Sequence, residues 1–255
     1  MAEALLKGML SAGRLSPAAT TVTDLREDRL RELSEVYGIQ TTTQTNDAVI
    51  DAAQIWLCVK PQQMDDVLAP LAGQLDTSLV VSIAAGVPCS RIENALGGQV
   101  RVVRVMPNTP ALVGEGMAGV AAGAHASQQD VDSVVQALRC VGKAVQVSEE
   151  DLHAVTAVSG SGPAYAFYMI EHLQQAGEEL GLSPDVANQL ALQTIKGAAL
   201  LMDETGEQAS VLRERVTSKG GTTAAALETF ADKGVGEGIK DGAKAAASRS
   251  RELAN

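Results

Sequence analysis

The stretch IWLCVKP, Ile55 to Pro61, decides the fold because it joins a short apolar run to a polar turn. The run Ile55 to Val59 is too short for a typical helix and is typical of a parallel strand that is buried on both faces. Lys60 and Pro61 follow directly, so we expect them at the carboxyl end of that strand, where open α/β sheets bind ligands. The stretch therefore predicts a parallel sheet and also the edge of that sheet where a ligand binds.

Similar apolar runs recur through the first 150 residues. Ser78 to Gly86 (SLVVSIAAG) and Arg101 to Met106 (RVVRVM) are predicted as buried strands, and Thr20 to Asp24 and Lys143 to Val147 as shorter ones. Helices are predicted between them at Leu25 to Tyr37, Gln62 to Leu75, Arg91 to Leu96 and from a cap at Ser127 to about Val141. This alternation indicates βαβ units in a doubly wound, Rossmann-type parallel sheet of the α/β class. We assign residues 1–150 to a dinucleotide-binding domain.

The pattern becomes purely helical after residue 150. Helices are expected from Pro163 to Leu180, from the cap at Ser183 to about Glu204, from Thr222 to about Asp232, and from Val235 onward. Residues 151–255 contain no convincing strand pattern, and the expected helices carry wide faces of Ala and Leu. Such faces predict an all-α domain that also packs against a second copy of itself.

Composition and charge exclude several classes of partner. The 255-residue chain has a net charge of −11 and a pI near 4.7, so it repels nucleic-acid backbones and anionic membrane surfaces. Its apolar runs are far shorter than the roughly 20 residues that a membrane span needs. Glu3 and Lys7 interrupt the first ten residues, so no signal peptide is indicated. We expect a cytoplasmic protein with neither a nucleic-acid nor a membrane partner.

No metal site is expected from the cysteines and histidines. The residues concerned are Cys58, Cys89, Cys140, His125, His153 and His172. None of them has the spacing of a metal-ligand pair, and the three separated cysteines suit free thiols in a reducing compartment.

A literal G-x-G-x-x-G occurs at Gly114 to Gly119. This motif binds a dinucleotide only between a strand and the helix whose N-terminus faces the pyrophosphate. The following residues, VAAGAHAS, have no amphipathic helical face and lead to a new helix cap at Ser127. We interpret the motif as a loop that runs into a strand.

The stretch VTSKGGTTAAAL, Val216 to Leu227, has the features of an anion site. Gly220 and Gly221 leave backbone N–H groups open to close approach, and Thr222 and Thr223 add hydroxyls where a helix starts. These residues would suit a small carboxylate. The same residues would also make an ordinary helix start, and the spacing does not decide between the two.

Five motifs together resemble one family over the whole length of the chain. They are VKP (Val59 to Pro61), SIAAGV (Ser82 to Val87), RVMPNTPALVGEG (Arg104 to Gly116), SGSGPAY (Ser159 to Tyr165) and TSKGGTT (Thr217 to Thr223). Their order and spacing are similar to those of pyrroline-5-carboxylate reductases. The resemblance implies reduction of the cyclic imine 1-pyrroline-5-carboxylate to L-proline with NAD(P)H, the last step of proline biosynthesis. It also implies a Rossmann domain, a helical dimerisation and substrate domain, and a homodimer that can assemble into a decamer of five dimers.

The resemblance assigns site residues position by position. The cofactor residues would be Asn46, Cys58, Val59, Lys60, Pro61, Ala85 and Asn108, with Asn108 close to the nicotinamide. The residues that hold the substrate carboxylate would be Ser218, Gly220, Gly221, Thr222 and Thr223. Thr223 would be the catalytic residue, as hydrogen-bond partner or proton donor of the imine nitrogen. A protonated imine is already electrophilic, so the reaction needs orientation more than acid or base groups.

The first residues, MAEALLKGML, depart from the family pattern. In the family a strand and a G-x-G-x-x-A turn precede the first helix, whereas Met1 and Ala2 match only the end of that turn. The fold class is therefore predicted as an N-terminally truncated doubly wound sheet. Losing four or five buried aliphatic residues would cost on the order of 10 kcal/mol, against about 5 to 15 for a whole domain. We expect poor folding or weak cofactor binding, and hypothesise that Met1 is an internal methionine.

Cofactor preference and overall function each have alternatives. Asp24 could hold the ribose hydroxyls of NADH and Arg26 the 2′-phosphate of NADPH, and family habit favours NADPH. One alternative function is a related hydroxy-acid dehydrogenase, for which Lys196 is the mid-helix lysine candidate. The other is a catalytically impaired, truncated subunit that pairs with an intact copy.

Overall fold

The computed structural model describes residues 1–75 and 77–254, which form two compact units. The first unit comprises residues 1–160 together with residues 246–254, and it contains the strands. The second unit comprises residues 161–245 and is helical throughout. The prediction of an α/β region followed by an all-α region is confirmed.

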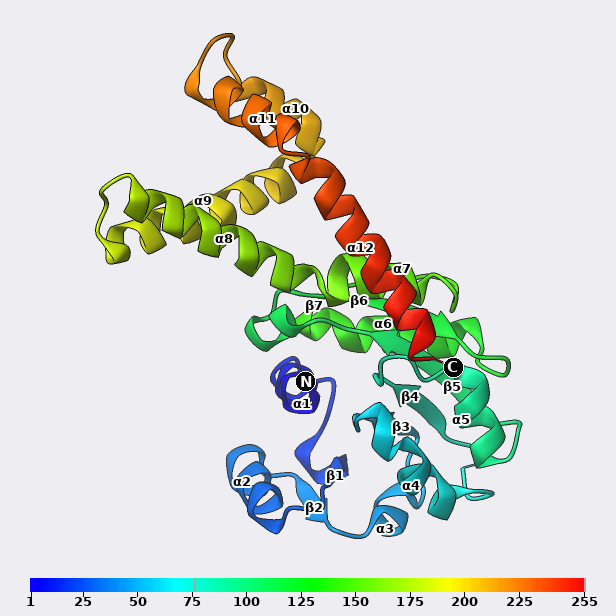
Figure 1. Ribbon diagram of the computed structural model, residues 1–255. Coiled ribbons are helices and arrows are strands. Elements are labelled where there is room, and N and C mark those ends of the chain that lie inside the picture. The colour runs from blue at the N-terminus through cyan, green and yellow to red at the C-terminus, as the bar shows by residue number, and fades with distance from the viewer. Residues whose placement is uncertain (76, 255) are drawn as a thin grey trace. The chain divides into compact units, whose positions relative to one another are not determined.

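A five-stranded sheet forms the centre of the first unit (Figure 1). Its order is β3 (Gln54–Leu57), β4 (Leu79–Ser82), β5 (Arg101–Met106), β6 (Gly116–Ala122) and β7 (Gly142–Gln146). Neighbouring strands are parallel except for β5 and β6, which are antiparallel. Residues 107–115 connect β5 to β6, and a parallel pairing needs a crossover of a dozen or more residues. The predicted parallel sheet is confirmed, with one antiparallel pair at β5 and β6.

Two further strands, β1 (Thr21–Thr23) and β2 (Gln40–Thr42), pair in parallel as a separate two-stranded sheet. The helix between them is α2 (Glu27–Tyr37), which ends at Gly38 in a left-handed conformation as the sequence predicts. Strand β2 was not expected. The next element, α3 (Thr45–Val49), follows it directly.

The apolar residues of β4 and β5 alternate between two buried layers, as a doubly wound sheet requires. On one face, Val81 and Val103 pack with Leu5 and Met9 of α1 (Ala2–Ser11) and with residues of α6 (Gln128–Leu138). Leu6 of α1 instead packs with Leu33 and Ile39. Helix α1 therefore contributes to the cores of both sheets in the first unit.

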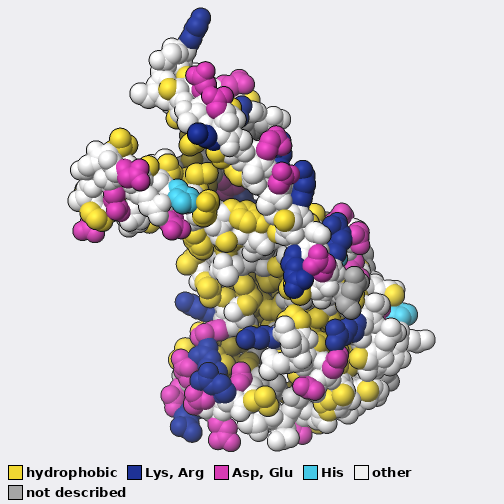
Figure 2. All heavy atoms as spheres, viewed as in Figure 1, with side chains coloured by type: hydrophobic (Ala, Val, Ile, Leu, Met, Phe, Trp, Pro, Cys, Tyr) yellow, Lys and Arg dark blue, Asp and Glu magenta, His cyan; other side chains and the backbone are white. Residues whose placement is uncertain are grey.

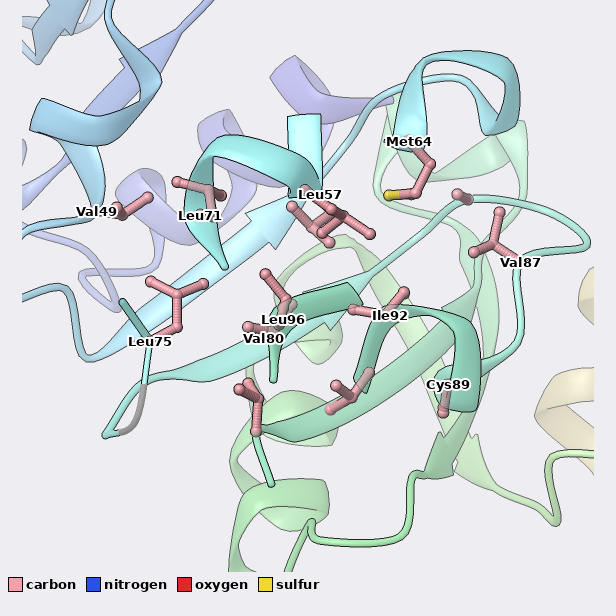
Figure 3. Close-up of a cluster of buried hydrophobic side chains, with 14 residues drawn as sticks. Val49, Leu57, Met64, Leu71, Leu75, Val80, Val87, Cys89, Ile92 and Leu96 are labelled. Atoms are coloured by element: carbon pink, nitrogen blue, oxygen red, sulfur yellow. The ribbon is translucent and has the colours of Figure 1, made fainter. Parts of the chain in front are cut away.

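The other face carries the cluster shown in Figure 3. Its large side chains come from α4 (Met64–Leu68), the 3₁₀ turn after it, α5 (Cys89–Leu96) and the strands, and include Leu57, Met64, Leu71, Val80, Ile92 and Leu96. The single helix predicted from Gln62 to Leu75 is corrected: α4 ends at Leu68 and a 3₁₀ turn follows at Ala69–Leu71. Pro70 explains the break because proline has no N–H to continue the helix.

Helix α6 begins as its sequence predicts. The Ser127 hydroxyl accepts the Asp130 N–H, and the Asp130 carboxylate accepts the Ser127 N–H, which is a complete capping box. After β7, the short helix α7 (Leu152–Val155) continues through a π-helical turn at Thr156–Gly160.

The second unit contains four helices and the first part of a fifth. They are α8 (Gly162–Glu179), α9 (Pro184–Thr205), α10 (Ala209–Arg215), α11 (Thr222–Asp232) and α12 (Val235–Glu252). Helix α10 was not expected. Large apolar side chains are exposed over this unit (Figure 2), among them Phe167, Tyr168, Leu190, Leu200 and Leu201. In the part of the chain that the structure describes, no helix is long and apolar enough to cross a membrane.

Candidate active site

The carboxyl ends of three neighbouring parallel strands form one edge of the five-stranded sheet. Leu57 of β3 pairs with Ser82 of β4, and Ser82 pairs with Arg104 of β5. The segments that follow these residues therefore start side by side. They contain six of the seven predicted cofactor residues, namely Cys58, Val59, Lys60, Pro61, Ala85 and Asn108.

Cys58, the first residue after β3, is half-buried. Burial raises the pKa of its thiol to about 11, so the thiol is protonated at neutral pH. Lys60 is exposed, and Pro61 begins a short 3₁₀ turn that leads into α4. This segment therefore offers a cation and backbone groups to a ligand, without covalent chemistry.

The loop between β4 and α5 is fixed by hydrogen bonds on both sides of Ala85. The Ala84 N–H donates to the Ser82 hydroxyl at 3.3 Å. At the far end, the Cys89 N–H donates to Glu149 Oε1 at 2.7 Å. Ala85 itself is exposed, whereas Ala84 and Gly86 are buried. The exposed Ala85 therefore lies between two hydrogen-bonded ends of the loop.

Glu149 and Arg104 were not anticipated as part of this support. Arg104 lies in β5, the middle strand of the sheet, with 4% of its surface exposed, and its guanidinium contacts Glu149 Oε1 at 3.1 Å. The same oxygen accepts the Cys89 N–H, so the carboxylate joins β5 to the start of α5. The sequence carried one sign of this ion pair: Arg104 lies within the apolar strand RVVRVM, and an arginine buried in a strand needs a charged partner.

Asn108 follows the end of β5, and both ends of its side-chain amide are hydrogen-bonded. Its Nδ2 donates to the Ser159 carbonyl at 3.0 Å, and its Oδ1 accepts the Met117 N–H at 2.8 Å. It therefore ties the end of β5 to β6 and to the SGSGPAY segment. In that segment Gly160 packs against Met106, where a side chain would collide with the Met106 methyl group.

The two-stranded sheet supplies a second group of polar residues. Asn46 is exposed in the first turn of α3, directly after β2. After β1, the Asp24 carboxylate accepts the Arg26 N–H at 2.9 Å, and the Arg26 guanidinium pairs with Asp28 at 2.6 Å. Both members of that pair are exposed, and such pairs contribute at most about 1 kcal/mol, so an anion can compete for Arg26.

The first turn of α1 is tied to α2. Glu3 accepts hydrogen bonds from Arg29 and from the Tyr37 hydroxyl, and the Tyr37 bond helps to lower the pKa of the Glu3 carboxyl. Met1 precedes α1 as its N-cap residue, and none of the described side chains caps this end.

The G-x-G-x-x-G motif runs into a strand, as predicted. Gly116 and Gly119 belong to β6, and their environments leave no room for a side chain, against Ala111 and Val155 respectively. Gly114 takes a left-handed conformation at the end of a 3₁₀ turn. The glycines serve close packing of the backbone rather than a helix start.

The predicted substrate residues lie together in the second unit: Ser218, Gly220 and Gly221 in the loop between α10 and α11, and Thr222 and Thr223 in the first turn of α11. Gly220 has φ +71°, and Gly221 leaves no space for a side chain because the Ser218 hydroxyl lies against it. Among the described side chains, none caps α11, which begins at Thr222. The Gly221 N–H donates to the Ser218 carbonyl at 3.0 Å, so the N–H groups that remain for an anion are those of the first turn of α11, with Ser218 and Lys219 exposed beside them.

The first unit has the fold and ligand edge of a dinucleotide-dependent oxidoreductase. Residues 1–86 match the family described as NADP oxidoreductase coenzyme F420-dependent, and residues 149–253 match that of pyrroline-5-carboxylate reductase dimerisation. The particular family is pyrroline-5-carboxylate reductase, to which the chain belongs.

Individual relatives support this assignment. The chain is 41% identical to a pyrroline-5-carboxylate reductase of Corynebacterium melassecola, over 98% of this chain and 94% of that protein. It is 40% identical to one of Pseudomonas aeruginosa, over 100% and 93%. A structure of the reductase from Coxiella burnetii matches with a TM-score of 0.93 at 35% identity, over 100% and 95%. The NADP-bound Plasmodium falciparum enzyme matches with a TM-score of 0.88 at 26% identity, over 99% and 94%.

Proposed function

We propose that the chain reduces 1-pyrroline-5-carboxylate to L-proline with NAD(P)H, as the last step of proline biosynthesis. The observation that carries the proposal is the loop before α11, where a turn at Gly220 and Gly221 opens onto uncapped backbone N–H groups. That arrangement suits one small carboxylate. The names of the relatives supply the identity of the imino acid that carries it.

The first unit would hold the cofactor. NAD(P)H fits there because the segments after β3, β4 and β5 start side by side at one edge of the sheet. The proposed contacts are Asn46, Cys58, Val59, Lys60, Pro61, Ala85 and Asn108. When bound, the cofactor supplies the hydride. The preferred form is NADPH, with Arg26 facing the 2′-phosphate.

The second unit would hold the substrate. Ser218, Gly220, Gly221, Thr222 and Thr223 are the proposed carboxylate ligands. Thr223 lies in the first turn of α11 and is half-buried, and its hydroxyl is the proposed hydrogen-bond partner or proton donor of the imine nitrogen.

The proposed assembly is a homodimer formed through residues 151–255, with a decamer of five dimers as its higher form. Residues 1–150 form the proposed cofactor domain. The family matched by residues 149–253 is named for dimerisation, and the apolar surface of α8 and α9 needs a cover. The proposed location is the cytoplasm.

Replacing Thr223 tests the substrate half of the proposal. Thr223→Ala should lower kcat for pyrroline-carboxylate reduction about 100-fold, the lower range for loss of a general acid. Thr229→Ala is the matched control because Thr229 lies on the same helix and bonds the Ala225 carbonyl at 3.0 Å. Equal rates for the two variants would exclude Thr223 from the chemistry.

The alternative, a hydroxy-acid dehydrogenase, depends on a lysine in the helical region. Lys196 is exposed on α9. Lys196→Ala should leave pyrroline-carboxylate reduction within about twofold of the wild type, because our assignment gives it no role. Loss of all activity in this variant would favour the alternative.

A further inference from the structure

The last turns of α12 belong to the unit that contains the sheet. Residues 246–254 group with residues 1–160, whereas the start of α12 groups with the helical unit. The contact is specific: the Ser250 hydroxyl lies 2.9 Å from Nδ1 of His153, and both residues are buried, at 6% and 7% exposed. Figure 1 shows this end of α12, in red, beside α7.

Further contacts extend this attachment on both sides of Ser250. The Arg251 guanidinium bonds Glu150 at 3.4 Å. Beyond it, the Leu253 carbonyl lies over Gly86, where an added methyl group would be only 3.1 Å from that oxygen. Gly86 also has φ +78°, which a side chain would strain. The end of α12 therefore covers the loop between β4 and α5.

This cover lies next to the exposed residue of that loop. Ala85 is exposed, while its neighbours Ala84 and Gly86 are buried, the latter beneath the backbone of Leu253. The Ser82 and Glu149 hydrogen bonds hold the two ends of the loop. The residues at the end of α12 contact the middle of the loop, between those two bonds, and so restrict it there.

We propose that Ser250 is a positioning residue for cofactor binding: by anchoring α12 on His153, it holds the loop at Gly86 and sets Ala85 against NAD(P)H. The inference rests on the proposed function, because the role of Ala85 is part of it. Removing the hydroxyl leaves a buried imidazole nitrogen without its partner, which favours release of the helix end. A site competent in only a fraction of molecules binds its ligand more weakly by that fraction.

A pair of serine variants tests the proposal. Ser250→Ala should raise the Kd for NADPH, measured by fluorescence titration, about five- to tenfold. The value of kcat at saturating NADPH should stay within about twofold of the wild-type value, because bound NADPH itself holds the loop at Gly86 in its competent position. Ser248→Ala is the matched control: it makes the same change two residues away at an exposed position of α12. It should leave the Kd unchanged.

Hydrogen exchange on the unaltered protein gives a second measurement that needs no variant. Coupling between two sites is reciprocal, so NADPH should slow amide exchange in residues 249–254 if these residues favour cofactor binding. Failure of the wild-type chain to bind NADPH would overturn both the proposed function and this inference. Normal NADPH binding with equal Kd values for Ser250→Ala and Ser248→Ala, and unchanged exchange at 249–254, would overturn the inference alone.

Discussion

The two units of the chain bury their apolar residues in different ways. In the sheet-containing unit, side chains such as Met64, Val80 and Ile92 are fully buried within the chain itself. In residues 161–245, the only buried side chains are those of Ala187 and Ala191, at 2% and 5% exposed. Leu200 and Leu201 on α9 remain about half exposed. The first unit buries its apolar side chains within the chain, whereas the second unit leaves its large apolar side chains exposed to solvent.

This difference indicates where a second copy binds. Contiguous apolar surface on a folded protein marks an interaction site, and closed homo-oligomers bury such surface on symmetric faces. The match of residues 149–253 to a dimerisation family agrees with that reading. The chain's stability should therefore depend on protein concentration in its helical unit and not in its sheet unit.

The largest effect is expected from a charge placed on the uncovered surface. Phe167 on α8 is 65% exposed. Phe167→Asp should convert the assembly to monomers in size-exclusion chromatography with light scattering, because an interface cannot bury an unpaired carboxylate. Val36→Asp is the matched change on the other unit, where Val36 is 64% exposed on α2. Identical masses for the two variants would contradict the conclusion that the second copy binds on the helical unit and not on the sheet unit.

A cavity in the first core should have the next largest effect. Leu96 is 1% exposed, and its replacement by Ala should lower the free energy of unfolding by about 2 to 5 kcal/mol. This loss should not change with protein concentration in denaturant titrations. Leu201→Ala should cost less and should vary with concentration. A concentration-dependent loss for Leu96→Ala would contradict the separation.

Cofactor preference should change by a smaller amount. The exposed Arg26–Asp28 pair can give way to a phosphate. Arg26→Ala should reduce the ratio of kcat/KM for NADPH to that for NADH about tenfold, or 1.4 kcal/mol. Arg31→Ala, which removes an exposed arginine of the same helix, should not alter the ratio. An unchanged ratio in Arg26→Ala would remove this residue from cofactor discrimination.

The smallest effect is expected from one proton on His153. Burial, together with nearby Arg104, lowers the pKa of His153 below its usual 6.5. Near pH 6 the unfolded chain therefore binds a proton that the folded unit does not bind. The contribution of neutral His153 to the free energy of unfolding is complete above about pH 6.5 and decreases as the pH falls below it. His153→Asn should flatten the dependence of unfolding free energy on pH. His172→Asn, at an exposed position of α8, should leave it as in the wild type.

Some elements could be predicted to the residue because local sequence decides them. Strand β5 and helix α11 have the bounds that the sequence indicates, and Gly38 ends α2 as expected. Strand β2 could not be found, since its three polar or half-buried residues have no alternation to detect. Helix α10 was missed because seven residues carry little periodic signal. The antiparallel direction of β6 follows from the length of the connection between β5 and β6, which is too short for a parallel crossover, and not from the pattern of apolar residues.

For the candidate site, the sequence indicates where the backbone segments lie but not which side chains support them. The segments after the strands and the glycine turn at Gly220 lie where their motifs indicate. The contacts of Glu149 with Cys89 and of His153 with Ser250 join positions 60 and 97 residues apart. Pairings at such separations depend on the packing of whole elements, which no local pattern records.

The most direct test of the central claim is a stoichiometric assay on this chain. NADPH oxidation in the presence of 1-pyrroline-5-carboxylate is followed optically, and proline is quantified in the same samples. The assignment predicts one proline formed for each NADPH oxidised, with no oxidation when the imino acid is omitted. Folded, NADPH-binding protein that forms no proline would contradict it.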